Sequence, residues 1–210
     1  MKRAEVAGRA RTLLLCGAVA GPLYIAVVVL QLLVRDGYDL GRHPASVLSN
    51  GDLGWLQIGN FAVTGLAFVA GAVGLRREGA GIWGPRLIGG FGAGMVAAAF
   101  FSADPVDGFP PGTPAGPPLT VSWQGLAHFL VSGLAFLALI AACFVFARRF
   151  AAEGRGGWAA FSAVVGTLFL ATWLALFALQ GSRAANLALA AAIALALIWT
   201  SLLALTHARR

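Results

Sequence analysis

The residues best suited to chemistry in this sequence are polar side chains at helical spacing inside long apolar segments. Gln124, His128 and Ser132 recur every four residues, so on one helix they form a single polar stripe. An imidazole on this stripe can hold a ligand by hydrogen bonds or exchange a proton with it near neutral pH. A histidine within a helix is also often a hydrogen-bonded structural group, and both interpretations of His128 stay open. If His128 binds a ligand or transfers a proton, the substitution His128→Ala should impair the function of the protein more than its folding.

A second polar stripe lies earlier in the chain, where Gln57, Asn60 and Thr64 follow i, i+3, i+7 spacing. Polar groups within a membrane span face the bundle interior or a wet cavity, because lipid does not solvate them. There they either bind a ligand or join neighbouring helices by hydrogen bonds. The ligand-binding residues that we predict within the spans are Gln57, Asn60, Gln124 and Ser132. Joining helices is the alternative for Asn60, Thr64 and Ser132.

Asp104 ends another apolar segment, immediately before a proline. With His128 it forms a candidate catalytic pair, in which one group acts as the acid and the other as the base. The end of a helix followed by a turn explains Asp104 equally well. His43 and Ser46, in the loop before the second stripe, are further ligand-binding candidates. Asp52 directly precedes a predicted helix and is expected to cap it.

The sequence lacks the motifs of several enzyme classes. It contains no P-loop, no His-Glu-x-x-His, no Gly-x-Ser-x-Gly and no Cys-x-x-Cys. His43, His128 and Asp104 are a speculative ligand set for zinc, which accepts histidine and carboxylate ligands. We predict no metal site and identify no cofactor, and whether the chain is an enzyme stays open.

The segments that must position these residues are long and apolar. Hydrophobic residues make up 59% of the chain and charged residues only 11%, which is too little charge for the surface of a soluble domain. A helix needs about 20 mainly apolar residues to cross a bilayer, and lipid cannot satisfy the open backbone groups of other structures. We predict an all-α, six-transmembrane-helix bundle that forms a single domain over residues 1–210. The predicted spans are 13–34, 54–75, 86–103, 124–147, 158–180 and 184–206.

The basic residues predict the orientation of these spans, since cytoplasmic segments carry an excess of Lys and Arg. Twelve basic residues fall on one side and only Arg35, Arg42 and Arg183 on the other. The twelve are Lys2, Arg3, Arg9, Arg11, Arg76, Arg77, Arg86, Arg148, Arg149, Arg155, Arg209 and Arg210. We predict a plasma (inner) membrane protein with both termini cytoplasmic, whose cations face anionic lipids and not nucleic acid. His207, beside the terminal arginines, is expected to be solvated.

Two of the predicted helices resemble each other. Residues 60–68 read Asn-Phe-Ala-Val-Thr-Gly-Leu-Ala-Phe, and residues 128–136 read His-Phe-Leu-Val-Ser-Gly-Leu-Ala-Phe. The offset of 68 residues predicts a parallel repeat of helical hairpins, helices 1-2 and helices 3-4. Asn60 and His128 would then lie at the same depth. We therefore expect Asn60, Asp104 and His128 to line one cavity that opens to the outer side.

Six of the nine prolines lie in the predicted loop between residues 104 and 123. Proline restricts φ, so this loop is expected to be semi-rigid. It can serve as a lid over the outer mouth of the cavity or as a plain spacer, and the sequence does not distinguish the two.

Three short motifs carry a resemblance to a known family. Asn60-Phe61, Phe101-x-x-Asp104 and His128 together resemble the uncharacterised prokaryotic membrane proteins grouped as domain-of-unknown-function family 998. The resemblance covers nearly the whole chain, including its six helices, and implies no reaction because the family has none assigned. The family looks distantly similar to membrane proteins of the Frag1/DRAM/Sfk1 type, which are associated with lipid organisation. Membrane hydrolases of the alkaline-ceramidase type use Ser, Asp and His at a zinc centre, but this chain lacks their late His-x-x-x-His and differs in helix number.

Three functions are consistent with these features. The favoured one is a multi-pass membrane protein whose outward-facing polar cavity binds or handles a lipid or amphiphilic small molecule. The second is an intramembrane enzyme, a hydrolase or lyase, that uses Asp104 and His128 with or without a metal. The third is a structural or assembly role, with other membrane proteins or in a homo-oligomer, through small-residue helix faces. One such face on the last helix consists of Ala184, Ala188, Ala192 and Ala196.

Overall fold

Six α-helices and one short 3-10 turn form the structure. The computed structural model describes residues 2–118 and 120–209, so Arg210 of the predicted inner cations lies outside it, as do the side chains of Lys2 and Arg3. The helices are α1 (Lys2–Val34), α2 (Gly54–Arg77), α3 (Trp83–Ala98), α4 (Trp123–Ala152), α5 (Gly156–Ala178) and α6 (Arg183–Ala208), and the 3-10 turn is η1 (Ala45–Ser49). Apart from an isolated bridge between Val106 and Phe109, the described segments contain no β-structure. The all-α prediction is confirmed.

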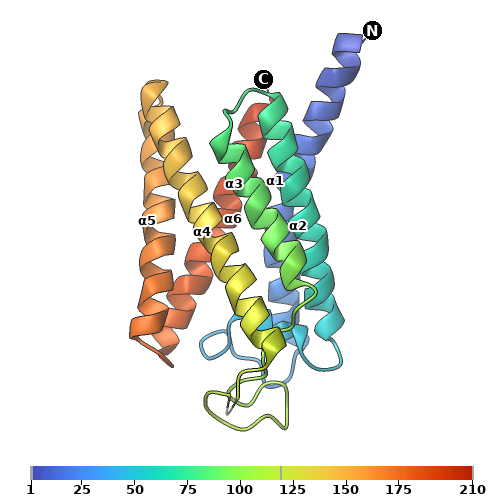
Figure 1. Cartoon of the computed structure of the whole chain (residues 1–210), viewed down its shortest axis with the longest axis vertical. Coiled ribbons are helices and arrows are strands. Elements are labelled where there is room, and N and C mark those ends of the chain that lie inside the picture. Colours follow the sequence, from blue (N-terminus) through green and yellow to red (C-terminus); the bar gives the residue numbers. More distant parts are fainter. Residues whose placement is uncertain (1, 119, 210) are drawn as a thin grey trace.

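The six helices form a ring in chain order. Each helix packs against the next one along the chain, α1 packs against α6 to close the ring, and α6 also touches α2. The start of α1 and the end of α6 lie at the same end of the bundle (Figure 1). The connections that follow α1, α3 and α5 lie at the opposite end, which we call the loop end. All five aspartates of the chain belong to these connections.

Five of the helices, α1, α2, α4, α5 and α6, are long and apolar enough to cross a membrane. They make the chain a multi-pass membrane protein. The third predicted span, 86–103, extends past the end of its helix, because α3 has 16 residues and ends at Ala98. At about 1.5 Å per residue α3 covers about 24 Å, less than the ~30 Å of a hydrocarbon core.

The chain continues from α3 to the loop end without helical structure. Two backbone carbonyl groups of this segment accept hydrogen bonds from side chains and not from the backbone N–H groups of a helix. The Nδ1 atom of His128 lies 2.7 Å from the Phe101 carbonyl oxygen, and the Asn50 amide donates to the Ala103 carbonyl at 2.9 Å. A non-helical segment at membrane depth is tolerated when such partners exist.

Glycines allow the neighbouring helices to approach closely. A Cβ atom added to Gly71 of α2 would lie 2.6 Å from the Cα atom of Gly17 in α1. The same crowding occurs where Gly65 of α2 meets Gly92 of α3, with a Cβ only 2.6–2.7 Å from the opposing carbonyl oxygen. Small residues at such contacts bring two backbones together and increase the van der Waals contact that holds membrane helices.

The loop cap, defined here as residues 35–53 and 99–118, has a small core of its own. Phe109 is completely buried and belongs to a cluster with Val28, Val47 and Leu48. The Phe109 ring meets the Tyr38 ring edge to face, with centroids 5.3 Å apart. This core joins the two connections that cover the loop end.

Arg35 fastens the loop cap to the end of α1. Its guanidinium donates hydrogen bonds to the carbonyls of Leu48 at 3.0 Å and Asn50 at 2.5 Å, and it lies 5.0 Å from the centre of the Phe109 ring. Burial lowers the pKa of Arg35, while the nearby Asp52 raises it.

Two predictions about helix ends are wrong. Asp52 does not cap α2, because Leu53 occupies the N-cap position and no side chain accepts a hydrogen bond there. His207 is not solvated but buried, with its Nδ1 atom 2.9 Å from the Leu203 carbonyl oxygen. The reason is that α6 continues to Ala208, so His207 lies on a packed turn of the helix and not beyond it.

Candidate functional site

One candidate site is a cavity of about 540 Å³ inside the ring of helices, toward the loop end. All six helices and the loop cap contribute to its lining. Four of the predicted site residues line it: Ser46, Asp104, His128 and Ser132. We call it the central cavity.

The central cavity is apolar along its walls and polar at the loop end. Its walls include Phe61 of α2, Phe91 of α3, Phe136 of α4 and Trp173 of α5. Most of its polar side chains come from the loop cap (Ser46 and Asp104) and from the first three turns of α4 (His128 and Ser132), and α1 adds the hydroxyl of Tyr24. Ligand pockets commonly combine an apolar lining with a few polar groups that fix the orientation of the ligand.

The central cavity also reaches the side of the bundle. Phe129 of α4 and Phe177 of α5 both line it, yet they are 54% and 45% exposed. Their rings meet edge to face, with centroids 6.1 Å apart. The seam between α4 and α5 is therefore an edge of the cavity that borders the lipid side of the helices.

The hydrogen bond of His128 fixes which of its ring nitrogens carries the proton. The Nδ1 atom faces the Phe101 carbonyl oxygen at 2.7 Å, and a carbonyl oxygen can only accept. The Nδ1 atom is thus the donor, and in the neutral ring the Nε2 atom is an acceptor. His128 is buried and lines the central cavity.

The Asp104 carboxylate supports the start of α4. Its Oδ1 atom accepts from the Ser122 hydroxyl at 2.6 Å, and its Oδ2 atom accepts from the Ser122 backbone N–H at 3.0 Å. The Ser122 hydroxyl in turn accepts from the Gly125 backbone N–H at 2.9 Å and caps the helix. A Cβ atom at position 125 would collide with the Asp104 carboxylate, so glycine there lets the carboxylate lie against the first turn of α4. A carboxylate beside a helix N-terminus is also favoured by the helix dipole.

The polar stripe of α2 does not line the central cavity. Gln57 is fully buried; its Oε1 atom accepts from Gln31 at 2.8 Å, and its Nε2 atom donates to the Tyr24 hydroxyl at 3.3 Å. The Asn60 amide donates to the Tyr24 backbone carbonyl at 3.2 Å. Thr64 donates to the Asn60 carbonyl within its own helix. The contacts of Gln57 and Asn60 join α1 to α2, which is the alternative that the sequence left open for Asn60, whereas the Thr64 hydroxyl bonds only within α2.

Gln124 and His43 also lie outside the lining of the central cavity. Gln124 is exposed at the start of α4. His43 is fully buried, and both of its ring nitrogens are used within the loop cap: Nδ1 accepts from the Asp39 N–H at 3.0 Å, and Nε2 donates to the Asp107 carbonyl at 3.0 Å. His43 therefore has the opposite tautomer to His128 and joins two segments of the loop cap.

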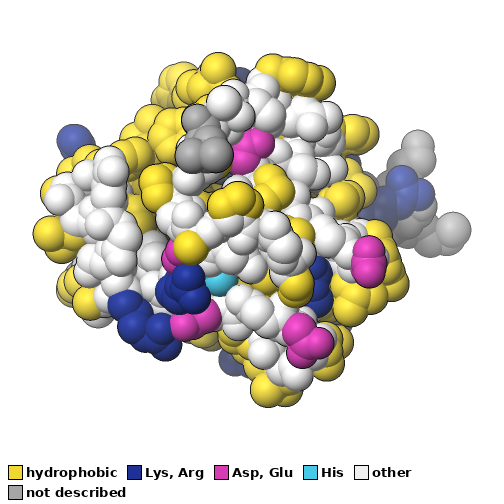
Figure 2. Space-filling model, turned by 90° about the horizontal axis from the view of Figure 1, so that it is seen from below, with side chains coloured by type: hydrophobic (Ala, Val, Ile, Leu, Met, Phe, Trp, Pro, Cys, Tyr) yellow, Lys and Arg dark blue, Asp and Glu magenta, His cyan; other side chains and the backbone are white. Residues whose placement is uncertain are grey.

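Two ion pairs hold the surface of the loop cap together. Asp107 pairs with Arg42 at 2.9 Å, and Asp39 pairs with Arg183 of α6 at 2.5 Å. Figure 2 views this end of the molecule and shows Arg and acidic side chains gathered on one side of it, with a histidine between them. The hydrogen bond from Arg42 lowers the pKa of Asp107 to about 2, and that from Arg183 lowers the pKa of Asp39.

Acid is therefore expected to loosen the loop cap. A depressed carboxyl pKa stabilises the folded loops above the ordinary value of 3.8, and this contribution is lost as the pH falls toward 2. Pepsin, which is active in this range, should cleave residues 104–118 faster at pH ~2 than at pH ~4 relative to a peptide standard. Asp107→Asn should be cleaved rapidly at both values, whereas the exposed Asp36→Asn serves as the control and should behave like the wild type. Equal relative cleavage of the wild type at both pH values contradicts the prediction.

His43, Asp104 and His128 do not assemble into a metal site. Among the residues that the structure describes, no three His, Cys, Asp or Glu side chains are placed to hold a metal ion. Each of the three side chains has separate hydrogen-bond partners instead.

Tyr24 is a cavity residue that the sequence analysis missed. It lines the central cavity from α1, and its hydroxyl and carbonyl receive the hydrogen bonds from Gln57 and Asn60. The chain contains only two tyrosines, and Tyr24 lies in the middle of an apolar span. A buried phenol usually has a hydrogen-bond partner, and this signal was present in the sequence.

A sequence model of the family described as "Protein of unknown function (DUF998)" matches residues 18–208, nearly the whole chain. No curated protein and no solved structure matches the chain.

Proposed function

This chain belongs to the DUF998 family of proteins of unknown function, and from its central cavity we propose that it binds a membrane lipid or a similar amphiphile. The observation that carries the proposal is the division of the cavity into apolar walls and a polar loop end. An amphiphile has the same division, since its chain is stabilised by apolar contact and its head group by hydrogen bonds.

The lateral edge between α4 and α5 supplies an entrance for such a ligand. Phe129 and Phe177 border the cavity and are about half exposed on the side that lipid would cover. A lipid chain can enter there without leaving the hydrocarbon. The His128 Nε2 atom then accepts a hydrogen bond from a head-group hydroxyl or amine.

The same proposal includes the topology predicted from the basic residues. Arg76, Arg77, Arg86 and Arg148 lie at the end of the bundle that carries the termini, and Arg42 and Arg183 lie at the loop end. An excess of cations on one side favours that side as the cytoplasmic one. We propose six crossings of the plasma membrane with the loop end outside, a parallel repeat of the first two helical hairpins, and a distant similarity to Frag1/DRAM/Sfk1-type proteins.

Lipid binding is favoured over catalysis by the contacts of Asp104. An enzyme that uses Asp104 as its acid or base needs a carboxylate that can exchange protons with a substrate. Both Asp104 oxygens accept hydrogen bonds from Ser122, and the carboxylate packs against Gly125. These contacts support an anchoring role for Asp104 at the start of α4.

An assembly role finds less support on α6. In the predicted small-residue face, Ala192 and Ala196 are buried inside the bundle, whereas Ala184 and Ala188 are exposed. Only the exposed half is accessible to a partner helix. We therefore place an assembly role through this face below lipid binding.

Filling the central cavity tests the proposed function. Ser132→Phe adds a ring to a partly buried position in the cavity wall and should reduce the lipid that copurifies with the protein at least about tenfold. Native mass spectrometry of protein released from gentle detergent measures this occupancy. The matched control is Leu134→Phe, which lies two residues away on the exposed face of α4 and should retain lipid. A wild type without bound lipid, or equal occupancy in the wild type and Ser132→Phe, overturns the proposal.

A further inference from the structure

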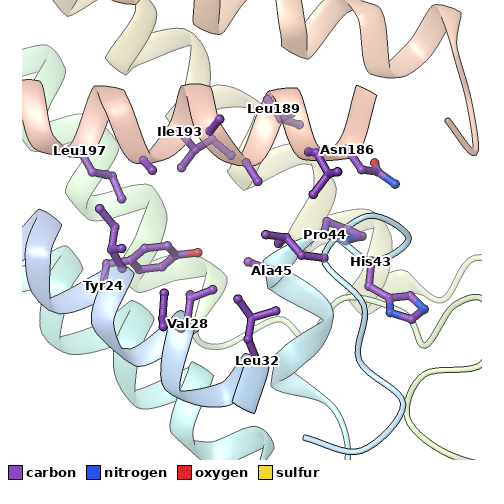
Figure 3. A pocket seen from close by; sticks show the side chains of 17 residues that line it. Tyr24, Val28, Leu32, His43, Pro44, Ala45, Asn186, Leu189, Ile193 and Leu197 are labelled. Carbon is purple, nitrogen blue, oxygen red and sulfur yellow. The ribbon is translucent and has the colours of Figure 1, made fainter. Parts of the chain in front are cut away.

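A second cavity lies between α1 and α6, on the other side of the bundle interior. It has a volume of about 300 Å³ and is closed toward the loop end by residues of the loop cap (Figure 3). Its lining includes Val28 and Leu32 of α1 and Ala190 and Ala194 of α6. We call it the α1–α6 groove. Nothing in the proposed function uses it.

The α1–α6 groove and the central cavity share one wall. Six residues line both of them: Tyr24, Pro44, Ala45, Leu189, Ile193 and Leu197. They come from α1, the loop cap and α6, so the shared wall extends from the middle of the bundle to the loop end. Two apolar compartments thus lie side by side and meet below the loop cap.

The shared wall carries one polar group. The Tyr24 hydroxyl oxygen accepts a hydrogen bond from the Gln57 amide, so its own hydrogen is available for donation. In Figure 3 this hydroxyl points along the groove toward Ala45 and Pro44. A ligand carbonyl group placed beside Tyr24 on the shared wall would accept a hydrogen bond from this hydroxyl.

The α1–α6 groove is also open to the membrane. Val29 of α1 and Leu187 of α6 line it and are 46% and 41% exposed. A hydrocarbon chain can therefore enter the groove sideways from the bilayer, as at the α4–α5 edge of the central cavity.

We propose that the two cavities hold the two hydrocarbon chains of a single membrane lipid. One chain lies in the central cavity and the other in the α1–α6 groove, and the linkage between the chains crosses the shared wall beside Tyr24. A single-chain amphiphile leaves one compartment unfilled, whereas a two-chain lipid buries apolar surface in both. This inference rests on the proposed function and specifies its ligand class.

A chain-selective blocking experiment tests the inference. The probes are dioleoyl phosphatidylglycerol and its single-chain lyso form, added to the full-length protein in detergent and measured by native mass spectrometry. The wild type should bind the two-chain lipid at least about tenfold more tightly than the lyso form. Ala190→Phe, which fills only the α1–α6 groove, should remove this difference and leave binding of the lyso form unchanged.

Three variants control the experiment. Ala194→Phe fills the same groove from a second position, and it should give the result of Ala190→Phe. Ala188→Phe adds the same ring to the exposed face of α6 and should behave as the wild type. Ser132→Phe fills the central cavity and should weaken binding of both lipids.

The outcomes separate this inference from the proposed function. If the wild type binds both lipids equally, or if filling the groove leaves the preference intact, the inference is overturned. The proposed function then still stands, provided that Ser132→Phe weakens binding. If the wild type binds neither lipid, the proposed function fails and the inference fails with it.

Discussion

Gly71→Ala is expected to lower the free energy of unfolding by about 1–3 kcal/mol, although it adds a single methyl group. The new Cβ atom would lie 2.6 Å from the Gly17 Cα atom, so two helix backbones must move apart to make room for it. No flexible side chain can relieve this contact. Thermal or denaturant unfolding of the protein in detergent micelles, followed by circular dichroism, measures the effect.

Gly59→Ala provides a matched control in the same helix. No atom lies within 4 Å of a Cβ atom added at Gly59. Since alanine is favoured over glycine in a helix by about 0.5–1 kcal/mol, Gly59→Ala should leave the stability unchanged or raise it. If Gly71→Ala and Gly59→Ala both unfold like the wild type, the close contact between α1 and α2 does not contribute to the stability of the protein.

His128→Leu is expected to destabilise the fold by about 1–3 kcal/mol and also to weaken lipid binding. Leucine fills a similar volume to histidine, but it removes the N–H group that donates to the Phe101 carbonyl just after the end of α3. The expected loss of stability differs from the sequence-based expectation that losing His128 impairs function more than folding. The unfolding free energy and the lipid occupancy of the same preparation distinguish the two expectations.

Two further variants separate the roles of His128. Gln at position 128 has an amide N–H that can donate to the carbonyl, so His128→Gln should recover part of the stability. Ser132→Ala, one turn further along α4, removes a cavity hydroxyl without a comparable contact and should leave the stability nearly unchanged. A His128→Leu variant as stable as the wild type would show that the Phe101 carbonyl needs no partner from His128.

The number and approximate bounds of the helices could be predicted from the sequence. Apolar length is a strong signal, and the predicted spans 54–75 and 184–206 fall within α2 and α6. α1 and α4 extend beyond their predicted spans, because a helix can continue past the hydrocarbon into the polar region. The end of α3 could not be predicted. Residues 99–103 are apolar enough to continue the helix, and their hydrogen-bond partners Asn50 and His128 are distant in the sequence.

Part of the lining of the central cavity could be predicted from the sequence. His128, Ser132, Asp104 and Ser46 line one cavity, as their placement near one end of the predicted bundle indicated. The sequence could not show that Asn60 is used by the Tyr24 carbonyl, since helical spacing gives the face of a residue but not its partner. It also could not show that His43 bonds to Asp107, 64 residues away in the chain.

The early end of α3 also affects how this protein is made. When residues 99–104 emerge from the ribosome, Asn50 has already emerged and can pair with the Ala103 carbonyl, but His128 follows Phe101 by 27 residues and is still inside the ribosome. An unpaired carbonyl in hydrocarbon is costly, so the segment after α3 cannot settle in the membrane alone. We expect the translocon to release α3 into lipid only together with α4, as one helical pair.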